Sequence, residues 1–521
     1  MLYAIVAVYI AIMLGIGFWC RKHASGVEGF VLGGRSLGGW FTAFAYGTSY
    51  FSAVVFIGYA GQFGWSYGAA ATWIGVGNAI LGSMLPWIIL GNRTRHMSKV
   101  LEAATMPEFF EKRYDSKSLK IVSAIIVFVF LIPYTASVYN GLSRLFGMAF
   151  DIPYEFCIIA MAILTAVYVI AGGYMATAIN DFIQGLIMLV GIVAVVIFVV
   201  RYNGGLAESL FGLGQISDAS TPPNTLNTLF GPDPINLFGV IILTSLGTWG
   251  LPQMVQKFYA VKDKKSVTRG TVISTIFALI VAGGSYFMGG FGRLFGSATP
   301  EEAEATGRTL IQSVNGKLAF DSIVPAMLKT ALPELLIGVV VVLVLSASMS
   351  TLSSLVLTSS STLTIDLIKP LSKKPLTEKR QVFIMRILIA AFLLLSVVIA
   401  LNPNTYITTL MSISWGALAG AFLAPFMFGL FSKRITRVAV WVSFALGVGI
   451  TVIHMFFFSL GLFPDLTKAA ASLPLNLASP INAGAAAMII TLIVTPIVSR
   501  LTKVSNTAHV DKIFEDCGNF D

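Results

Sequence analysis

Thirteen long apolar runs constrain this chain more than any other feature of its sequence. Each run reaches the roughly 20 residues that a helix needs to cross a bilayer, and charged residues or Pro, Gly and Asn separate one run from the next. The runs are 2–20, 39–66, 69–91, 119–147, 154–173, 177–200, 235–258, 270–292, 334–360, 382–401, 406–431, 438–462 and 479–499. They predict an all-α polytopic membrane protein with 13 transmembrane helices.

Composition agrees with this fold class. Only 11% of the 521 residues are charged and 56% are hydrophobic, whereas soluble domains average about 25% charged residues. Such a chain cannot bury its apolar side chains inside water-facing domains. A soluble enzyme, a nucleic-acid binder and a disordered scaffold are therefore excluded, and we expect a multi-pass protein of the plasma (inner) membrane.

The basic residues predict the orientation. The inner loops collect the cations, among them the stretch from Lys257 to Arg269, as the positive-inside rule describes. The alternation leaves seven of the 34 Lys and Arg residues outside: Arg144, Arg201, Arg293, Arg308, Lys317, Lys329 and Lys468. We therefore predict the N-terminus outside and the C-terminus inside.

No catalytic centre is indicated. The outer stretches 202–234 and 294–333 have room for short surface helices but not for a soluble domain of 50 or more residues. The four histidines do not cluster, the three cysteines lack metal-like spacing, and the HExxH and GxSxG motifs are absent. We predict that the protein is not an enzyme and that transport is the remaining broad class.

Two polar, Gly-containing interruptions lie in mid-membrane at corresponding places in the two halves. They are 45–53 and 244–253, and Pro252 gives the second a cause for breaking. Packing through small residues explains either segment alone, but their paired positions favour the broken helices of inverted-repeat transporters. The predicted segments are a peripheral first helix with its inner loop (1–38), a first five-helix repeat (39–201), an outer loop (202–234), a second five-helix repeat (235–431), and two peripheral helices with a cytoplasmic tail (432–521).

Polar side chains inside the spans suggest a cation site. Ala347, Ser350, Thr351 and Ser354 share one helix face, with Ser353 at its border, and hydroxyl and carbonyl oxygens suit Na⁺. Ser and Thr also bond their own i−4 carbonyls, which accounts for most of those after residue 356. Asp181 either serves a cation or caps the helix that follows Gly172-Gly173.

Several motifs resemble the sodium:solute symporter family. They are Gly29 to Leu37 before the second span, Gly47 to Gly58 in the first broken helix, Ala347 to Ser354, and Ser414-Trp415-Gly416. The resemblance runs from about residue 3 to 460. It implies a 5+5 inverted-repeat core of the amino-acid transporter (LeuT-like) type with peripheral helices.

The resemblance also implies ion ligands. The main Na⁺ site would use the backbone carbonyls of Thr48, Phe51 and Ala347 with the hydroxyls of Ser350 and Thr351. Some members bind a second Na⁺ through residues that match Asp181, Ser350, Ser353 and Ser354. The expected cofactor is one Na⁺, with candidate ligands present for a second.

Solute contacts carried over from the family fall at Tyr50, Tyr134, Thr244, Thr248, Trp249, Gln253 and Trp415. Proline-type members carry an acid at the position of Tyr50 and aromatic residues at Thr244 and Thr248. The stretches 49–53, 250–252 and 262–265 resemble the pantothenate branch more closely.

These features together predict a secondary active transporter that symports Na⁺ and a small organic solute into the cell by alternating access. A carboxylate such as pantothenate is the first choice, and proline or another amino acid is the alternative. Proton coupling is a rival within the same class, and a non-accumulating channel or substrate sensor is a rival from another class. The expected partners are the solute and the lipid bilayer, with no nucleic acid and no obligate protein partner.

Overall fold

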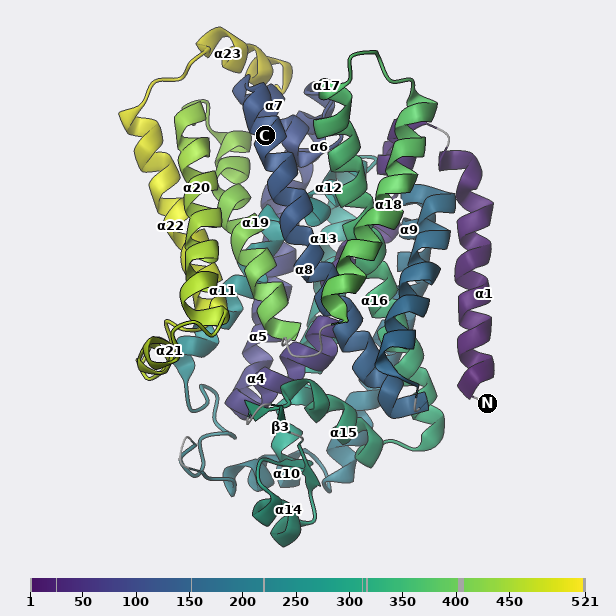
Figure 1. Ribbon diagram of the computed structural model, residues 1–521, viewed down its shortest axis with the longest axis vertical. Coiled ribbons are helices and arrows are strands. Elements are labelled where there is room, and N and C mark those ends of the chain that lie inside the picture. Colours follow the sequence, from purple (N-terminus) through teal and green to yellow (C-terminus); the bar gives the residue numbers. More distant parts are fainter. Residues whose placement is uncertain are drawn as a thin grey trace.

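The helices of the computed structural model run side by side along the long axis of the molecule, and connecting segments gather at its two ends (Figure 1). The structure describes residues 2–24, 26–150, 152–218, 221–311, 313–314, 317–401 and 407–518. The N-terminus lies at the end that carries α10 (Leu206–Gly214), and α23 (Thr507–Asp516) lies at the other end (Figure 1). This arrangement agrees with an odd number of crossings.

Long apolar stretches form helices because a backbone without water must bond to itself. The helices of the first half are α1 (Leu2–Cys20), α3 (Gly39–Tyr50), α4 (Ala60–Tyr67), α5 (Thr72–Ala79), α6 (Asn92–Val100), α8 (Lys117–Phe150) and α9 (Tyr154–Tyr202). Those of the second half are α11 (Pro234–Gly250), α12 (Pro252–Ala260), α13 (Lys264–Gly289), α16 (Glu334–Thr362), α18 (Glu378–Ala400), α19 (Ile407–Phe431), α20 (Arg437–His454) and α22 (Pro480–Leu501). Tyr406, where we predict the eleventh span to begin, lies outside the described residues.

Short helical turns extend or connect these helices. The π-helical turns are η3 (Val54–Tyr59), η5 (Ile80–Met84), η6 (Trp87–Gly91), η9 (Leu363–Ile368) and η10 (Met455–Ser459). The short α-helices outside the outer segments are α2 (Val27–Leu32), α7 (Met106–Tyr114), α17 (Lys369–Leu371) and α21 (Pro464–Ala471). The 3₁₀ turns are η1 (Arg21–Ala24), η2 (Gly33–Arg35), η4 (Gly68–Ala71), η7 (Gly292–Leu294) and η8 (Phe320–Ser322).

The outer segments hold the short helices that we expect there, and four two-residue strands that we do not. The helices are α10, α14 (Pro300–Thr306) and α15 (Ile323–Ala331). Strand β1 (Gly296–Ser297) pairs in parallel with β2 (Thr309–Leu310), and β3 (Ser313–Val314) pairs antiparallel with β4 (Lys317–Leu318). Two-residue strands escape prediction because two residues cannot establish an alternating pattern.

Within the described residues, nine helices are long and apolar enough to cross a membrane, or ten if the bent pair α11 and α12 is one span. Two of the nine stretches contain 47 and 49 residues, or about 70 Å of helix against roughly 30 Å of bilayer hydrocarbon. Each is interrupted by a glycine at positive φ, Gly68 at 59° and Gly173 at 56°. Dividing both there and including α1 leads to thirteen crossings. The thirteen-span topology and its orientation remain predictions.

Both predicted helix breaks are present. Helix α3 ends at Phe51, whose backbone is extended at φ −89° and ψ 118°. Helix α11 ends at Leu251, with φ −78° and ψ 124°, and α12 continues at a bend of 46°. A glycine lies four residues before each break. The N–H groups of Phe51 and Leu251 donate the last regular helical hydrogen bonds, to the carbonyls of Gly47 and Gly247.

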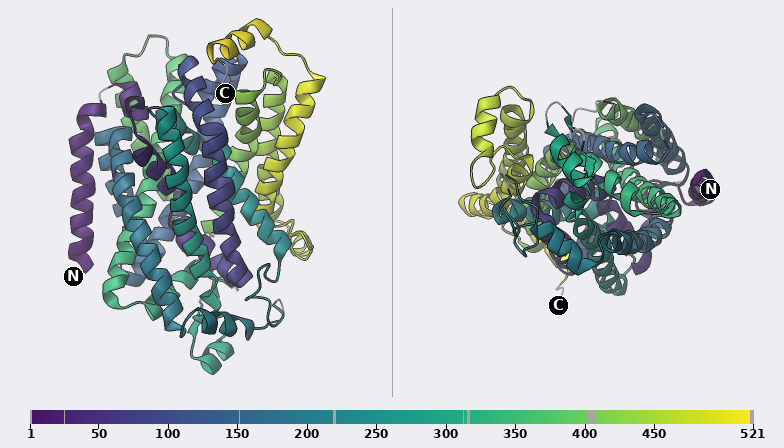
Figure 2. Two further views of the ribbon diagram at one scale, coloured as in Figure 1. Left: turned by 180° about the vertical axis from the view of Figure 1, so that it is seen from behind. Right: turned by 90° about the horizontal axis from the view of Figure 1, so that it is seen from below.

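The peripheral helices lie on opposite sides of the bundle. Helix α1 packs against α9 and α16, and α20 and α22 pack against α19 on the far side (Figures 1 and 2). The end view in Figure 2 has the remaining helices between them. The broken helices α3 and α11 therefore belong to the interior of the bundle, where little water reaches their free backbone groups.

Close helix contact around the first broken helix depends on glycine. A β-carbon on Gly64 of α4 would overlap the carbonyl oxygen of Gly289 at the end of α13. We expect Gly64→Ala to destabilise the protein by about 1–3 kcal/mol, because backbone atoms cannot move aside as a flexible side chain can. The measurement is thermal unfolding of the purified protein in detergent. Gly449→Ala, which adds a β-carbon with nothing within 4 Å, is the control, and equal melting temperatures would contradict this packing.

Candidate functional site

The break of α3 and the middle of α16 bring a group of oxygen atoms together. The Ser350 hydroxyl lies 2.9 Å from the carbonyl oxygen of Thr48 and 3.1 Å from that of Ala347. The Thr351 hydroxyl lies within 3.1–3.5 Å of four carbonyl oxygens, those of Ala347, Thr48, Ser49 and Phe51. We call these six oxygens the oxygen cluster. It contains all five atoms predicted for the main ion site, together with the Ser49 carbonyl, which we did not predict.

The oxygen cluster holds more acceptors than protons. Two hydroxyl groups can donate only two hydrogen bonds, yet four carbonyl oxygens converge on them. Thr48, Ser350 and Thr351 are fully buried, so bulk water does not reach these carbonyls to donate further hydrogen bonds. A small cation bound by hard oxygen ligands would satisfy the surplus lone pairs. The donor set therefore fits Na⁺, and no group of three or more His, Cys, Asp and Glu in the described residues offers a site for a transition metal.

Several hydroxyls in the last turns of α16 and in η9 bond within the helix. Ser360, Ser361 and Thr364 donate to the carbonyls of Leu357, Thr358 and Ser360, three or four residues earlier. Thr358 instead donates to the side chain of Gln256 on α12. None of these four hydroxyls bonds an oxygen of the cluster, so the cluster involves none of them.

The residues predicted for a second ion surround a lysine. The Ser354 hydroxyl accepts a 2.9 Å hydrogen bond from the ammonium of Lys257, which also lies 3.9 Å from a carboxylate oxygen of Asp181. The Ser353 hydroxyl donates to the carbonyl of Ser350. The sequence predicts Lys257 to be an inner-loop cation, but it lies on α12 with only 2% of its side chain exposed. The sequence feature that could have indicated a buried lysine is its place in the last turn of α12, whose other residues are uncharged.

Asp181 does not cap a helix end. The non-helical residue of α9 is Gly173, so Asp181 lies two turns inside the segment that follows it. Its side chain is fully buried, and neither carboxylate oxygen has a hydrogen-bond partner among the described residues. The N-terminal charge interaction that we considered acts only within the first turn. The structure therefore favours the cation interpretation of this residue.

Three predicted solute contacts form an aromatic group beside the oxygen cluster. The ring centroid of Trp415 lies 6.1 Å from that of Tyr50 and 5.9 Å from that of Tyr134. These rings come from α3, α8 and α19, which are distant in sequence. Tyr50 directly follows Thr48 and Ser49 and precedes Phe51, so its backbone is part of the segment that supplies the cluster.

Several buried polar atoms of these rings and of the surrounding helices have no hydrogen-bond partner among the described residues. They are the hydroxyls of Tyr50, Tyr134 and Tyr286, the Trp415 Nε1, the Gln253 Oε1 and the Asn78 Nδ2. Tyr134 and Tyr286 are also electrostatic neighbours of Tyr50. Unpaired buried donors and acceptors are costly, which is why they concentrate where a ligand completes them. We call this set, with the three rings, the aromatic site.

The polar groups of three other predicted contacts are already hydrogen-bonded within the protein. Thr248 donates to the carbonyl of Gly82, and the Trp249 Nε1 donates to that of Leu81, both in η5. Thr244 bonds the side-chain oxygen of Asn78 on α5. Thr244, Thr248 and Trp249 therefore join α11 to the α5–η5 segment and use their polar groups in doing so. The Thr248 hydroxyl, which we predict to contact the solute, is thus hydrogen-bonded to η5.

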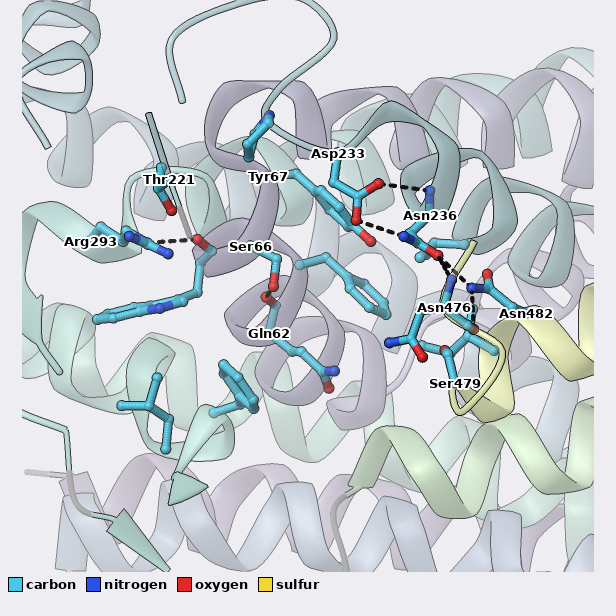
Figure 3. A pocket seen from close by; sticks show the side chains of 17 residues that line it. Gln62, Ser66, Tyr67, Thr221, Asp233, Asn236, Arg293, Asn476, Ser479 and Asn482 are labelled. Atoms are coloured by element: carbon cyan, nitrogen blue, oxygen red, sulfur yellow. Dashed lines mark hydrogen bonds between the residues drawn. The ribbon is translucent and has the colours of Figure 1, made fainter. Parts of the chain in front are cut away.

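A cavity of about 400 Å³ lies at the end of the bundle that carries the outer segments. Its walls include Gln62 of α4 and Asn236 of α11 (Figure 3). These two helices are the halves of the broken helices that lie nearer the outer segments. Asn236 donates to Asp233, and its side-chain oxygen accepts from Asn482 and from the backbone of Asn476 (Figure 3). The cavity is polar, as a path for a hydrated solute requires.

Known proteins are similar to this chain in sequence and in fold. Residues 30–447 match the model of the sodium:solute symporter family. The sodium/proline symporters of Staphylococcus aureus strains JH9 and NCTC 8325 are each 32% identical over 445 residues, covering 84% of this chain and 82% of theirs. A Na⁺-coupled sialic acid symporter, solved in a substrate-bound outward-open state, has a TM-score of 0.68 at 17% identity and covers 96% of this chain and 98% of its own.

The family match spans most of the chain, and the curated relatives exceed 30% identity over most of their own length. The solved structure supports the same multi-pass helical fold. The chain belongs to the sodium:solute symporter family.

Proposed function

We propose that this protein is a Na⁺-coupled symporter of a small solute that carries one carboxylate. The carrying observation is the oxygen cluster, in which four carbonyls meet two hydroxyls within 3.5 Å. Thr48, Phe51, Ala347, Ser350 and Thr351 hold the Na⁺, with the Ser49 carbonyl alongside. Bound Na⁺ supplies the positive charge that the neutral oxygens of the cluster lack.

Coupling follows from the position of Tyr50. Its neighbours Thr48, Ser49 and Phe51 present their carbonyls to the ion, so ion binding fixes the backbone from which the Tyr50 ring projects. A solute in the aromatic site then contacts a Tyr50 ring that is already ordered. The contacts of the solute stabilise the same backbone segment in turn. Each ligand thereby raises the affinity for the other, as linkage requires. The solute contacts that we propose are Tyr50, Tyr134, Gln253 and Trp415.

The solute class follows from charge. The aromatic site contains hydroxyls, an indole N–H and amides but no acidic side chain among the described residues, and Asp181 is paired with Lys257. A solute ammonium would therefore lack an anionic partner. A carboxylate can use the phenol and indole donors, the bound Na⁺ and the N-terminal end of α12. A monocarboxylate such as pantothenate fits this arrangement.

Proline is a second candidate, because the curated relatives are sodium/proline symporters at 32% identity. The faces of the Trp415 and Tyr50 rings could attract its ammonium by cation–π interaction. Either solute would enter through the polar outer cavity, and rocking of helix bundles in the plasma membrane would release it inside. No step of this proposal is catalytic.

Uptake into proteoliposomes, with labelled pantothenate and labelled proline in separate experiments, tests the function. Accumulation above the external concentration should require an inward Na⁺ gradient and stop when K⁺ replaces Na⁺. Accumulation that survives without Na⁺ and depends on Asp181 would mean proton coupling. Equilibration without accumulation would mean a channel, and solute binding without any flux would mean a sensor.

The hydroxyl ligands of the oxygen cluster predict a specific change in Na⁺ dependence. Thr351→Ala and Ser350→Ala should each raise the Na⁺ concentration for half-maximal uptake about tenfold, which corresponds to about 1.4 kcal/mol per lost ligand. Ser361→Ala is the matched control, since its hydroxyl is equally buried on the same helix but donates to Thr358. The same Na⁺ dependence in all three variants would refute the site.

The unpartnered hydroxyl of Tyr50 predicts a change in solute affinity. Tyr50→Phe should weaken solute binding about tenfold and leave solute-free Na⁺ binding nearly unchanged, because only the phenol hydroxyl is removed. Tyr46→Phe is the control: the Tyr46 hydroxyl is buried one turn away and donates to Gly82. Titration calorimetry in saturating Na⁺ with pantothenate, proline and a simple monocarboxylate measures both. Unchanged affinity in Tyr50→Phe, with tight proline binding to the wild type, would reject the pocket and the solute class.

A further inference from the structure

The ammonium of Lys257 lies where the family resemblance leads us to expect a second sodium ion. It is 2.9 Å from the hydroxyl of Ser354 and 3.9 Å from the nearer carboxylate oxygen of Asp181. The ring of Tyr174 also lies beside it, with the centroid 5.1 Å from the nitrogen. Two of the four residues expected to bind the ion therefore bind this side chain instead.

This lysine is buried in the interior of the bundle. Its side chain is 2% exposed and that of Asp181 is 0% exposed. A buried carboxylate needs a positive partner, and removing that partner leaves a costly unpaired charge. Lys257 is the partner within 4 Å of Asp181 among the described residues. Asp181 thus has its counter-ion without any bound metal.

A sodium ion at the same place would meet the ammonium at close range. Both carry one positive charge, and like charges a few ångström apart in a dry interior repel strongly. Ser354 has also committed its hydroxyl, which is 2.7 Å from the hydroxyl of Ser49 and accepts from Lys257. Asp181, Ser353 and Ser354 therefore do not fit a second Na⁺ while Lys257 keeps this position.

The lysine also reaches the first ion site. Ser354 bonds the side chain of Ser49, and the backbone carbonyl of Ser49 belongs to the oxygen cluster, 3.4 Å from the Thr351 hydroxyl. Lys257 lies on α12, the second half of the other broken helix. Through Ser354 and Ser49, the two broken helices meet beside the Na⁺ position.

We propose that Lys257 is a tethered cation that occupies the second sodium position, so that the protein binds a single Na⁺. It also holds α12 against α16 and the break of α3. This inference rests on the proposed function, because it takes the oxygen cluster as the remaining Na⁺ site. The lysine acts as a positioning residue and does not touch the solute.

Equilibrium binding of ²²Na⁺ to the purified, solute-free protein tests the proposal by counting ions. The wild type should bind one ²²Na⁺ per chain at saturation. Lys257→Met should bind two, because the methionine removes the competing charge and leaves Asp181 free for an ion. The double variant Lys257→Met/Asp181→Asn should return to one. Lys262→Met, which removes an exposed lysine just beyond α12, should behave as the wild type.

The possible outcomes are distinct. Two ions in the wild type, or one ion in a folded Lys257→Met protein, would overturn the tethered cation and leave Na⁺ symport intact. No saturable ²²Na⁺ binding to the wild type would instead overturn the proposed function. Gel filtration identifies variants that fail to fold. If Lys257→Met does not fold, two ions bound to the wild type would still overturn the proposal.

Discussion

The structure depends on how the broken backbone of α3 is satisfied inside the bundle. Where the helix stops at Phe51, the carbonyls of Thr48, Ser49 and Phe51 lose their regular partners in a place without water. The hydroxyls of Ser350 and Thr351 on α16 approach all three. Two protons cannot satisfy every carbonyl there, so the proposed Na⁺ would stabilise a break that is unfavourable by itself.

The second broken helix is held differently. Thr244, Thr248 and Trp249 tie α11 to α5 and η5 through neutral hydrogen bonds, whereas Lys257 ties α12 to α16 and α9 through its charge. The hydroxyls of Ser83 and Ser274 add a link between η5 and α13. The contacts from α12 to α16 therefore include a charged one, through Lys257, and a neutral one, between Thr358 and Gln256. The contacts named within the α5–α11–α13 group are all neutral.

Much of this arrangement follows from the sequence because the signals are local. A Gly-rich polar stretch inside an apolar run and Pro252 after Gly250-Leu251 predict both breaks. The spacing of Ala347, Ser350, Thr351 and Ser354 predicts one helix face, and the structure has the first three of these in the oxygen cluster. Thr244, Thr248 and Trp249 could not be placed in this way, because a helix position identifies a face only relative to neighbours that the sequence does not name. The burial of Lys257 could not be predicted for a related reason. A lysine near the end of a span resembles an inner-loop cation until a buried carboxylate is known to lie beside it.

The sequence by itself determined the membrane class, the positions of the helix breaks and the residue types able to bind a small cation, since hydropathy, Pro and Gly act over a few residues. Only the tertiary structure decided which oxygens converge, which polar groups remain unpaired around Tyr50, Tyr134 and Trp415, and which cation neutralises Asp181. These features depend on groups that lie far apart in the chain, such as the Thr351 hydroxyl and the Thr48 carbonyl, which are 303 residues apart. Their meeting is governed by packing, which no local pattern encodes.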